Sequence, residues 1–152
     1  MWKDAFSSPL PTAGLSSWWV HIGHCKSGYI QIGCCTIDGA VAFGLAAYSG
    51  HGLVLATRRV SDTTHRWHLS EDGRNRVVET EALADADGRP VNLRRDATGA
   101  EVLVTMDHDE GQLSLLVNGR SWCRMAGFPP GAELRPWVAL YDKGDRVSLH
   151  WC

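Results

Sequence analysis

The chain has 152 residues, of which 44% are hydrophobic and 21% are charged, and its formal net charge is −2. This length and composition predict one globular domain with a hydrophobic core of its own. The small negative charge excludes the broad basic surface that nucleic-acid-binding proteins use.

The start of the chain gives no targeting signal. Lys3 and Asp4 are charged and no apolar segment follows them, so a secretory signal peptide is not expected. The longest apolar stretch, residues 40–48, is about half the length that a membrane span needs. We therefore expect a protein of the cytoplasm or nucleus that contacts no membrane.

The first predicted strands cover residues 17–24 and 28–36. In the first of them, Trp18, Val20 and Ile22 share one face, while Trp19 and His21 share the other. Residues 40–48 fit either a short helix or a buried strand, because the apolar run has no clear period. Leu53–Leu55 is a possible short strand. Two more strands, residues 65–70 and 76–80, are predicted around the turn Glu71-Asp72-Gly73.

The clearest pattern in the sequence is a β-hairpin over residues 101–118. Apolar residues alternate on both sides of the acidic turn Asp107–Gly111, which predicts one buried face. The second strand stops at Asn118-Gly119, a tight-turn dipeptide, so a third strand is expected at once. Residues 134–151 are predicted to form a closing hairpin.

The seven tryptophans divide into two groups. Trp18, Trp67, Trp137 and Trp151 occupy the apolar phase of predicted strands, so we assign them to the core. Trp2, Trp19 and Trp122 fit the core less clearly and are candidate surface anchors.

No metal site or catalytic centre is predicted. Asp107–Gly111 lacks the glycine and glutamate spacing of a calcium loop, so we interpret it as a turn whose aspartates accept local backbone hydrogen bonds. His21 and His24, like His65 and His68, are three residues apart and face opposite sides of a strand. The five cysteines, Cys25, Cys34, Cys35, Cys123 and Cys152, have no CxxC spacing and are interpreted as reduced thiols.

Five segments, in order, resemble the SPRY domain. They are Trp18–Ile22, Tyr29–Gly33, the Trp67–Gly73 segment (Trp-x-Leu-x-x-Asp-Gly), the hairpin Asp107–Gly119, and Leu134–Leu149. The likeness covers about residues 15–151. It implies an all-β fold, an antiparallel β-sandwich of the concanavalin-like jelly-roll type. It also implies a single domain, residues 1–152, with N-terminal strands that are short or missing and no PRY extension.

The resemblance implies a non-catalytic module that binds a peptide segment of a partner protein through loops at one rim of the sandwich. Such a module serves as the substrate-recognition part of a ubiquitin ligase or of a scaffold protein. We expect a monomer without cofactors. Val54 and Asp142 stand where one peptide-binding subfamily has a tyrosine and a tryptophan, so its ligand does not transfer. The partner-binding candidates are loop residues that have no role in the predicted core: Tyr48, His51, Arg58, Arg59, Asp142 and Lys143.

Two other classes of function stay open at this point. In a lectin-like β-sandwich, Trp19 or Trp122 would stack on sugar rings, while Asp or Asn side chains would bind hydroxyl groups. The absence of a secretion signal argues against that alternative. A hydrolase on the same scaffold would need paired carboxylates or an activated nucleophile, and no local motif supplies either.

Overall fold

The computed structural model describes residues 3–37, 41–46, 53–57, 79–84, 97–126, 128 and 131–152. Eleven strands and no helix occur in these ranges. The strands are β1 (Lys3–Phe6), β2 (Leu15–His24), β3 (Ile30–Thr36), β4 (Val41–Ala46), β5 (Leu53–Thr57), β6 (Glu79–Ala84), β7 (Glu101–Asp107), β8 (Gln112–Val117), β9 (Ser121–Ala126), β10 (Leu134–Leu140) and β11 (Arg146–Trp151). None of the described residues belongs to a helix that is long and apolar enough to cross a membrane.

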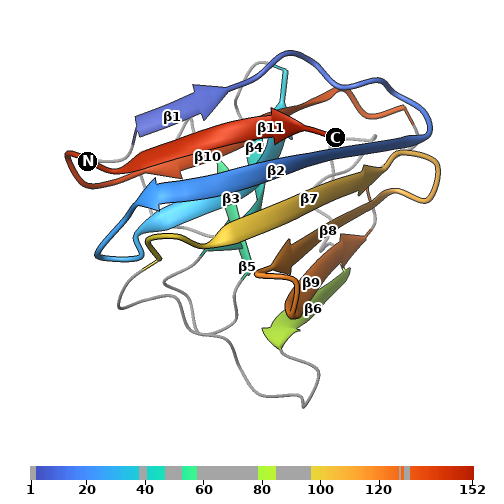
Figure 1. Ribbon diagram of the computed structural model, residues 1–152. Coiled ribbons are helices and arrows are strands. Elements are labelled where there is room, and N and C mark those ends of the chain that lie inside the picture. The colour runs from blue at the N-terminus through green and yellow to red at the C-terminus, as the bar shows by residue number, and fades with distance from the viewer. Residues whose placement is uncertain are drawn as a thin grey trace.

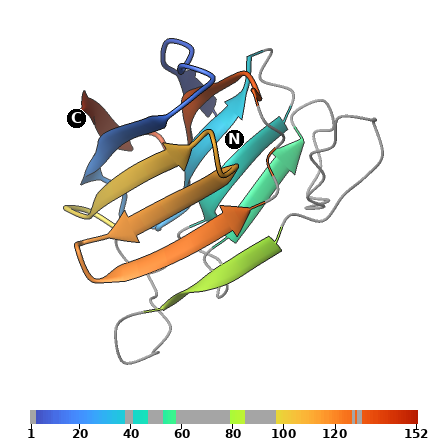
Figure 2. The same ribbon diagram turned by 90° about the vertical axis from the view of Figure 1, so that its right-hand side faces the viewer.

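The strands form two antiparallel sheets that pack face to face. The six-stranded sheet has the order β11-β2-β7-β8-β9-β6 and lies in front in Figure 1. The five-stranded sheet, β1-β10-β3-β4-β5, lies behind it, and the two layers are also separate in Figure 2. The predicted all-β antiparallel sandwich is therefore confirmed.

Strict alternation of buried and exposed side chains builds the core of the six-stranded sheet. Trp18, Val20 and Ile22 of β2 are fully buried, whereas Trp19 and His21 between them are half-buried on the outer face. Strands β7 and β8 alternate in the same way. Because side chains in a strand point to opposite faces in turn, one face of each strand faces the other sheet. The main core is thus the layer between the two sheets. A second, smaller buried cluster lies on the other face of the five-stranded sheet and consists of Cys35, Ala42, Trp137 and Ala139.

The hairpin and its turn match the sequence-based prediction. Strands β7 and β8 pair from Val102–Val117 to Asp107–Gln112. Oδ1 of Asp107 accepts hydrogen bonds from the backbone N–H groups of Asp109 and Glu110, at 3.1 and 3.0 Å. Asn118 takes φ = 53°, and β9 follows directly as the expected third strand. Residues 40–48, for which the sequence left a helix and a strand open, contain strand β4.

Two predictions were wrong. Residues 134–151 do not form a hairpin, because β10 pairs with β1 and β3 in one sheet and β11 pairs with β2 in the other. Trp151 is 51% exposed and does not belong to the core. It has the phase of a core residue, but β11 is an edge strand, so no further strand covers its ring. Trp67 lies outside the described residues.

Candidate functional site

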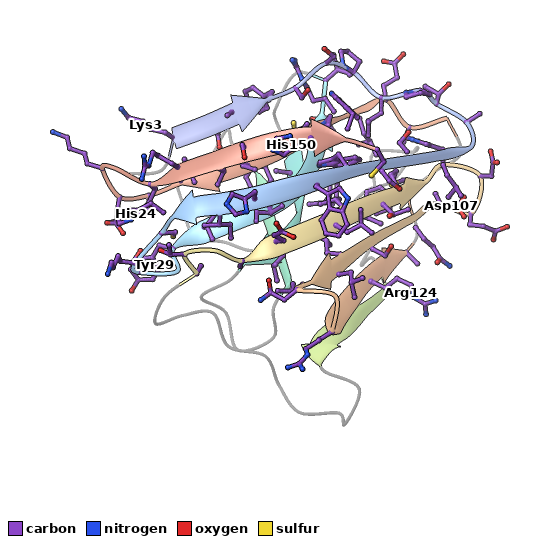
Figure 3. All side chains as sticks on the ribbon, in the orientation of Figure 1. Lys3, His24, Tyr29, Asp107, Arg124 and His150 are labelled. Carbon is purple, nitrogen blue, oxygen red and sulfur yellow. The ribbon has the colours of Figure 1, made fainter. Side chains whose placement is uncertain are left out.

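Three connections meet at one end of the sandwich: residues 25–29 between β2 and β3, residues 97–100 before β7, and residues 141–145 between β10 and β11. We call this surface the rim. The backbone N–H of Ala97 donates to the carbonyl of Cys25 at 2.9 Å, and the N–H of Cys25 donates to Oγ1 of Thr98 at 3.0 Å. Figure 3 shows Tyr29 and His24 at this end and Asp107 at the other. Hydrogen bonds therefore hold the first two connections together.

An exposed aromatic pair joins the first and third connections of the rim. The rings of Tyr29 and Tyr141 meet edge to face, with centroids 5.5 Å apart and an interplanar angle of 70°. Their exposed fractions are 39% and 42%. Ile30 follows Tyr29 in the chain, and Leu140 precedes Tyr141. These two residues are paired where β3 begins and β10 ends. The two strands thus deliver the tyrosines to the same place, where the rings hold each other in position.

The turn at residues 141–145 carries two of the predicted site residues, Asp142 and Lys143, and both are exposed. The hydroxyl of Ser27 donates a short hydrogen bond to Oδ2 of Asp142. The backbone N–H of Asp142 donates to Oδ2 of Asp145 at 3.1 Å. The Cys25 thiol lies 3.8 Å from that same oxygen, and its pKa is raised by burial first and by the nearby Asp145 charge second. Asp142 is therefore held in place before any partner arrives.

The other four predicted site residues, Tyr48, His51, Arg58 and Arg59, lie outside the described residues. The strands around them show where their loops start. Ala46 at the end of β4 pairs with Gln31, so the chain leaves β4 at the rim end of the sheet. Thr57 at the end of β5 pairs with Val41, so the segment that leads into Arg58 starts at the opposite end.

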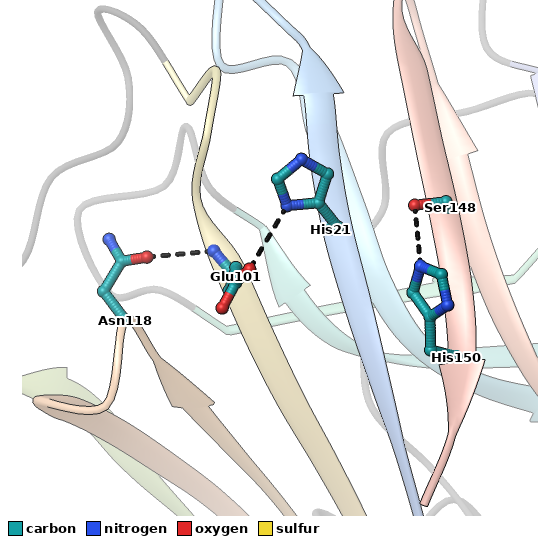
Figure 4. Close-up of polar contacts among 5 residues, drawn as sticks. All are labelled: His21, Glu101, Asn118, Ser148 and His150. Atoms are coloured by element: carbon teal, nitrogen blue, oxygen red, sulfur yellow. Dashed lines mark hydrogen bonds and ion pairs between the residues drawn. The ribbon is translucent and has the colours of Figure 1, made fainter.

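A groove of about 310 Å³ opens on the outer face of the six-stranded sheet, beside the rim. It is lined by Trp19, Val20, His21, Glu101 and His150. Nδ1 of His21 lies 3.5 Å from Oε1 of Glu101, and the backbone N–H of Glu101 donates to Oδ1 of Asn118 at 2.9 Å. His150 and the Ser148 hydroxyl are 3.2 Å apart (Figure 4).

Strand register explains why these side chains gather. His150 pairs with Trp19, and Ser148 pairs with His21, across β11 and β2. His21 in turn pairs with Glu101 across β2 and β7. Residues opposite each other on neighbouring strands point to the same face, so three strands place their side chains on one patch. One contact joins Ser148 to His150, and another joins His21 to Glu101.

The described residues contain no group of three or more His, Cys, Asp or Glu side chains that is arranged to hold a metal ion. Tyr29, Tyr141 and His150 are not among the site residues that the sequence pattern predicts. The sequence signal that could have indicated the two tyrosines is their position next to predicted turns, because loops on a rigid scaffold commonly carry binding residues. Trp19 was identified as a surface candidate, and it lines the groove.

Comparison with known proteins supports the fold. No protein-family model matches the chain, and no curated protein matches it in sequence. Among solved structures, it is similar to the crystal structure of the SPRY domain of human HERC1, with a TM-score of 0.50 and 14% sequence identity. The match covers 99% of this chain and 82% of that chain. The resemblance seen in the sequence thus extends to three dimensions, and the chain has the antiparallel β-sandwich fold of SPRY domains.

Proposed function

We propose that this chain is a non-catalytic protein-interaction module that binds a peptide segment of a partner protein at the rim. The observation that supports this function best is the exposed Tyr29–Tyr141 pair. Tyrosine provides a large contact area at a low cost in conformational entropy, and it is enriched among the residues that dominate binding energy. Strands β3 and β10 hold the pair, so little ordering is needed when a partner binds.

Polar groups that can fix the orientation of a peptide lie next to the tyrosines in the chain. Asp142 is held by Ser27, and Lys143 is exposed beside it. The loop that carries Tyr48 and His51 leaves β4 at the same end of the sheet, which supports including both residues in the binding surface. Arg58 and Arg59 belong to this surface only if the chain after Thr57 returns to the rim.

A module of this kind works in the cytoplasm or nucleus as a monomer, without a cofactor. It supplies substrate recognition to a ubiquitin ligase or a scaffold protein, which is the role implied by the resemblance to SPRY domains. The rest of that machinery would come from another part of a longer protein or from a partner.

Selection from a peptide-display library, followed by calorimetry with an enriched peptide, tests the proposal. We expect Tyr29→Ala and Tyr141→Ala each to weaken binding by about tenfold or more, with little change in the melting temperature. Leu15→Ala is the matched control, because Leu15 is 70% exposed at the opposite end of β2. Failure to enrich any peptide, or equal losses in the tyrosine variants and the control, would contradict a binding site at the rim.

The double variant Arg58→Ala/Arg59→Ala tests the extent of the site. A loss of about 1–3 kcal/mol relative to Arg94→Ala/Arg95→Ala would include the first pair in the binding surface. Equal losses in the two double variants would indicate an effect of bulk charge and would limit the site to the two tyrosines and the turn at residues 141–145.

A further inference from the structure

The groove beside the rim combines three aromatic rings with one carboxylate. The indole of Trp19 and the imidazoles of His21 and His150 line it together with Glu101. Glu101 supplies the only carboxylate among the lining residues. Aromatic faces and a carboxylate share one electrostatic property, because both present negative potential to a ligand.

The geometry leaves the carboxylate accessible. The side chain of Glu101 is 59% exposed, and its closest ion-pair contact, with His21, is at 3.5 Å. Oδ1 of Asn118 accepts a hydrogen bond of 2.9 Å from the backbone N–H of Glu101, which fixes the position of this residue at the start of β7. Trp19 is half-buried, and its own strand and the two neighbouring strands support it.

The size of the groove limits what it can hold. A volume of about 310 Å³ is at the lower end of the range for small-ligand sites. It suits a single head group and not an extended peptide. Proteins recognise quaternary ammonium groups and methylated lysine side chains by placing aromatic faces against the cation. The groove has aromatic residues and a carboxylate in its lining.

We infer that the groove formed by Trp19, His21, Glu101 and His150 is a binding site for an organic cation, with the ammonium head group placed over the indole and paired with the Glu101 carboxylate. The ligand class is a quaternary ammonium group, either on a small molecule or on a trimethylated lysine of a protein. The site lies on the face of the six-stranded sheet and does not include the rim tyrosines. The inference therefore goes beyond the proposed function and does not depend on it.

Titration with choline and with 3,3-dimethylbutan-1-ol, its uncharged isostere, tests the inference. The titrations are followed by chemical shifts of the Trp19 indole N–H, at about pH 8, where an ordinary imidazole is neutral. We expect saturable binding of choline and binding of the uncharged isostere that is about tenfold weaker or undetectable. Equal binding of both probes would identify a merely apolar groove and would overturn the inference, as would the absence of saturable choline binding.

Variants assign the interaction to the groove. Glu101→Gln removes the charge at a surface position and is expected to weaken choline binding by about tenfold, whereas Glu133→Gln, an exposed glutamate outside the groove, leaves it unchanged. Trp19→Phe keeps a ring and retains part of the affinity, and Trp19→Ala abolishes it. Equal effects of the two glutamate variants would contradict the site.

A short glycine-rich peptide with one trimethyllysine distinguishes the two ligand sources. Tighter binding of this peptide than of choline would assign the groove to a modified protein partner, whereas equal binding would assign it to a free small cation. Binding of a neutral glycan on an array, competed by neither cation, would instead identify a carbohydrate site and overturn the inference.

Discussion

The indole of Trp137 donates a hydrogen bond from Nε1 to Oδ1 of Asp4, at 3.0 Å. Trp137 is in the middle of β10 and is 1% exposed, while Asp4 belongs to the short edge strand β1. Ala139, the neighbour of Trp137 on the same face of β10, is the residue that pairs with Asp4. A buried side chain of the smaller cluster, on the face of the five-stranded sheet that points away from the other sheet, thus fixes the first strand of the chain.

Removing either partner of this bond should destabilise the fold, by different amounts. Trp137→Ala is expected to cost about 3–5 kcal/mol of unfolding free energy, because it empties a large buried volume. Asp4→Ala leaves the buried indole N–H without this acceptor and should cost about 1–3 kcal/mol. Chemical denaturation followed by fluorescence measures both values. An effect of Trp137→Ala below about 1 kcal/mol would show that the indole is not packed in the folded protein.

The paired glycines Gly33 and Gly44 should tolerate no side chain. A Cβ atom on Gly33 would overlap the carbonyl oxygen of Phe43, and backbone atoms cannot move aside as a flexible side chain does. Gly33→Ala is therefore expected to cost about 3 kcal/mol. Gly23→Ala is the matched control, because its Cβ would be 3.5 Å from the nearest atom, an ordinary contact. Equal denaturation midpoints for the two variants would refute the close approach of β3 and β4.

His108 should make the protein less stable in mild acid. Burial lowers its pKa below the ordinary value of 6.5, and the nearby charges of Asp109 and Asp107 oppose this shift only in part. Between pH 6.5 and the lowered pKa, His108 is protonated in the unfolded chain but not in the folded chain. The free energy of unfolding therefore falls as the pH falls. His108→Gln should reduce the loss of melting temperature between about pH 7 and pH 5. An unchanged pH profile in this variant would assign the effect to other histidines.

The thiols should differ sharply in reactivity. Cys25, Cys34 and Cys35 are buried, whereas Cys152 is exposed. Burial, followed by the neighbouring Cys35, raises the pKa of Cys34 far above its usual range, and the thiolate is the reactive form. A thiol reagent should label Cys152 first among these four, and mass spectrometry of the unfolded, unreduced chain should count all five cysteines as free. A lower count would reveal a disulfide bond.

The fold was predictable from sequence where the pattern is local. The hairpin of β7 and β8 follows from period-two alternation and from Asn118-Gly119, because both signals act between neighbouring residues. The sheet to which β10 and β11 belong was not predictable in this way. Their partners, β3 and β2, lie far away in the sequence, and a short turn fits either a hairpin or a change of sheet.

The same distinction applies to the candidate sites. The exposure of Asp142 and Lys143 was predictable, because both belong to a turn outside the predicted core. Their role in binding stays a prediction. The contact between Tyr29 and Tyr141 was not predictable, because it depends on the register of β3 against β10. The groove depends in the same way on the register of three strands. Alternation shows which side chains share a face of one strand, but it does not show which strands lie beside each other.

The connections at residues 25–29 and 141–145 each carry the chain from one sheet to the other, since β2 and β11 belong to the six-stranded sheet and β3 and β10 to the five-stranded sheet. The Tyr29–Tyr141 contact therefore lies where the two layers are covalently joined. A ligand that contacts both tyrosines would bind where the two sheets are connected. Because it binds the folded state, it would stabilise the whole domain. A thermal-shift screen on the unlabelled chain is consequently a direct way to search for the ligand, because occupancy at the rim would be read out as a rise in the melting temperature of the entire sandwich.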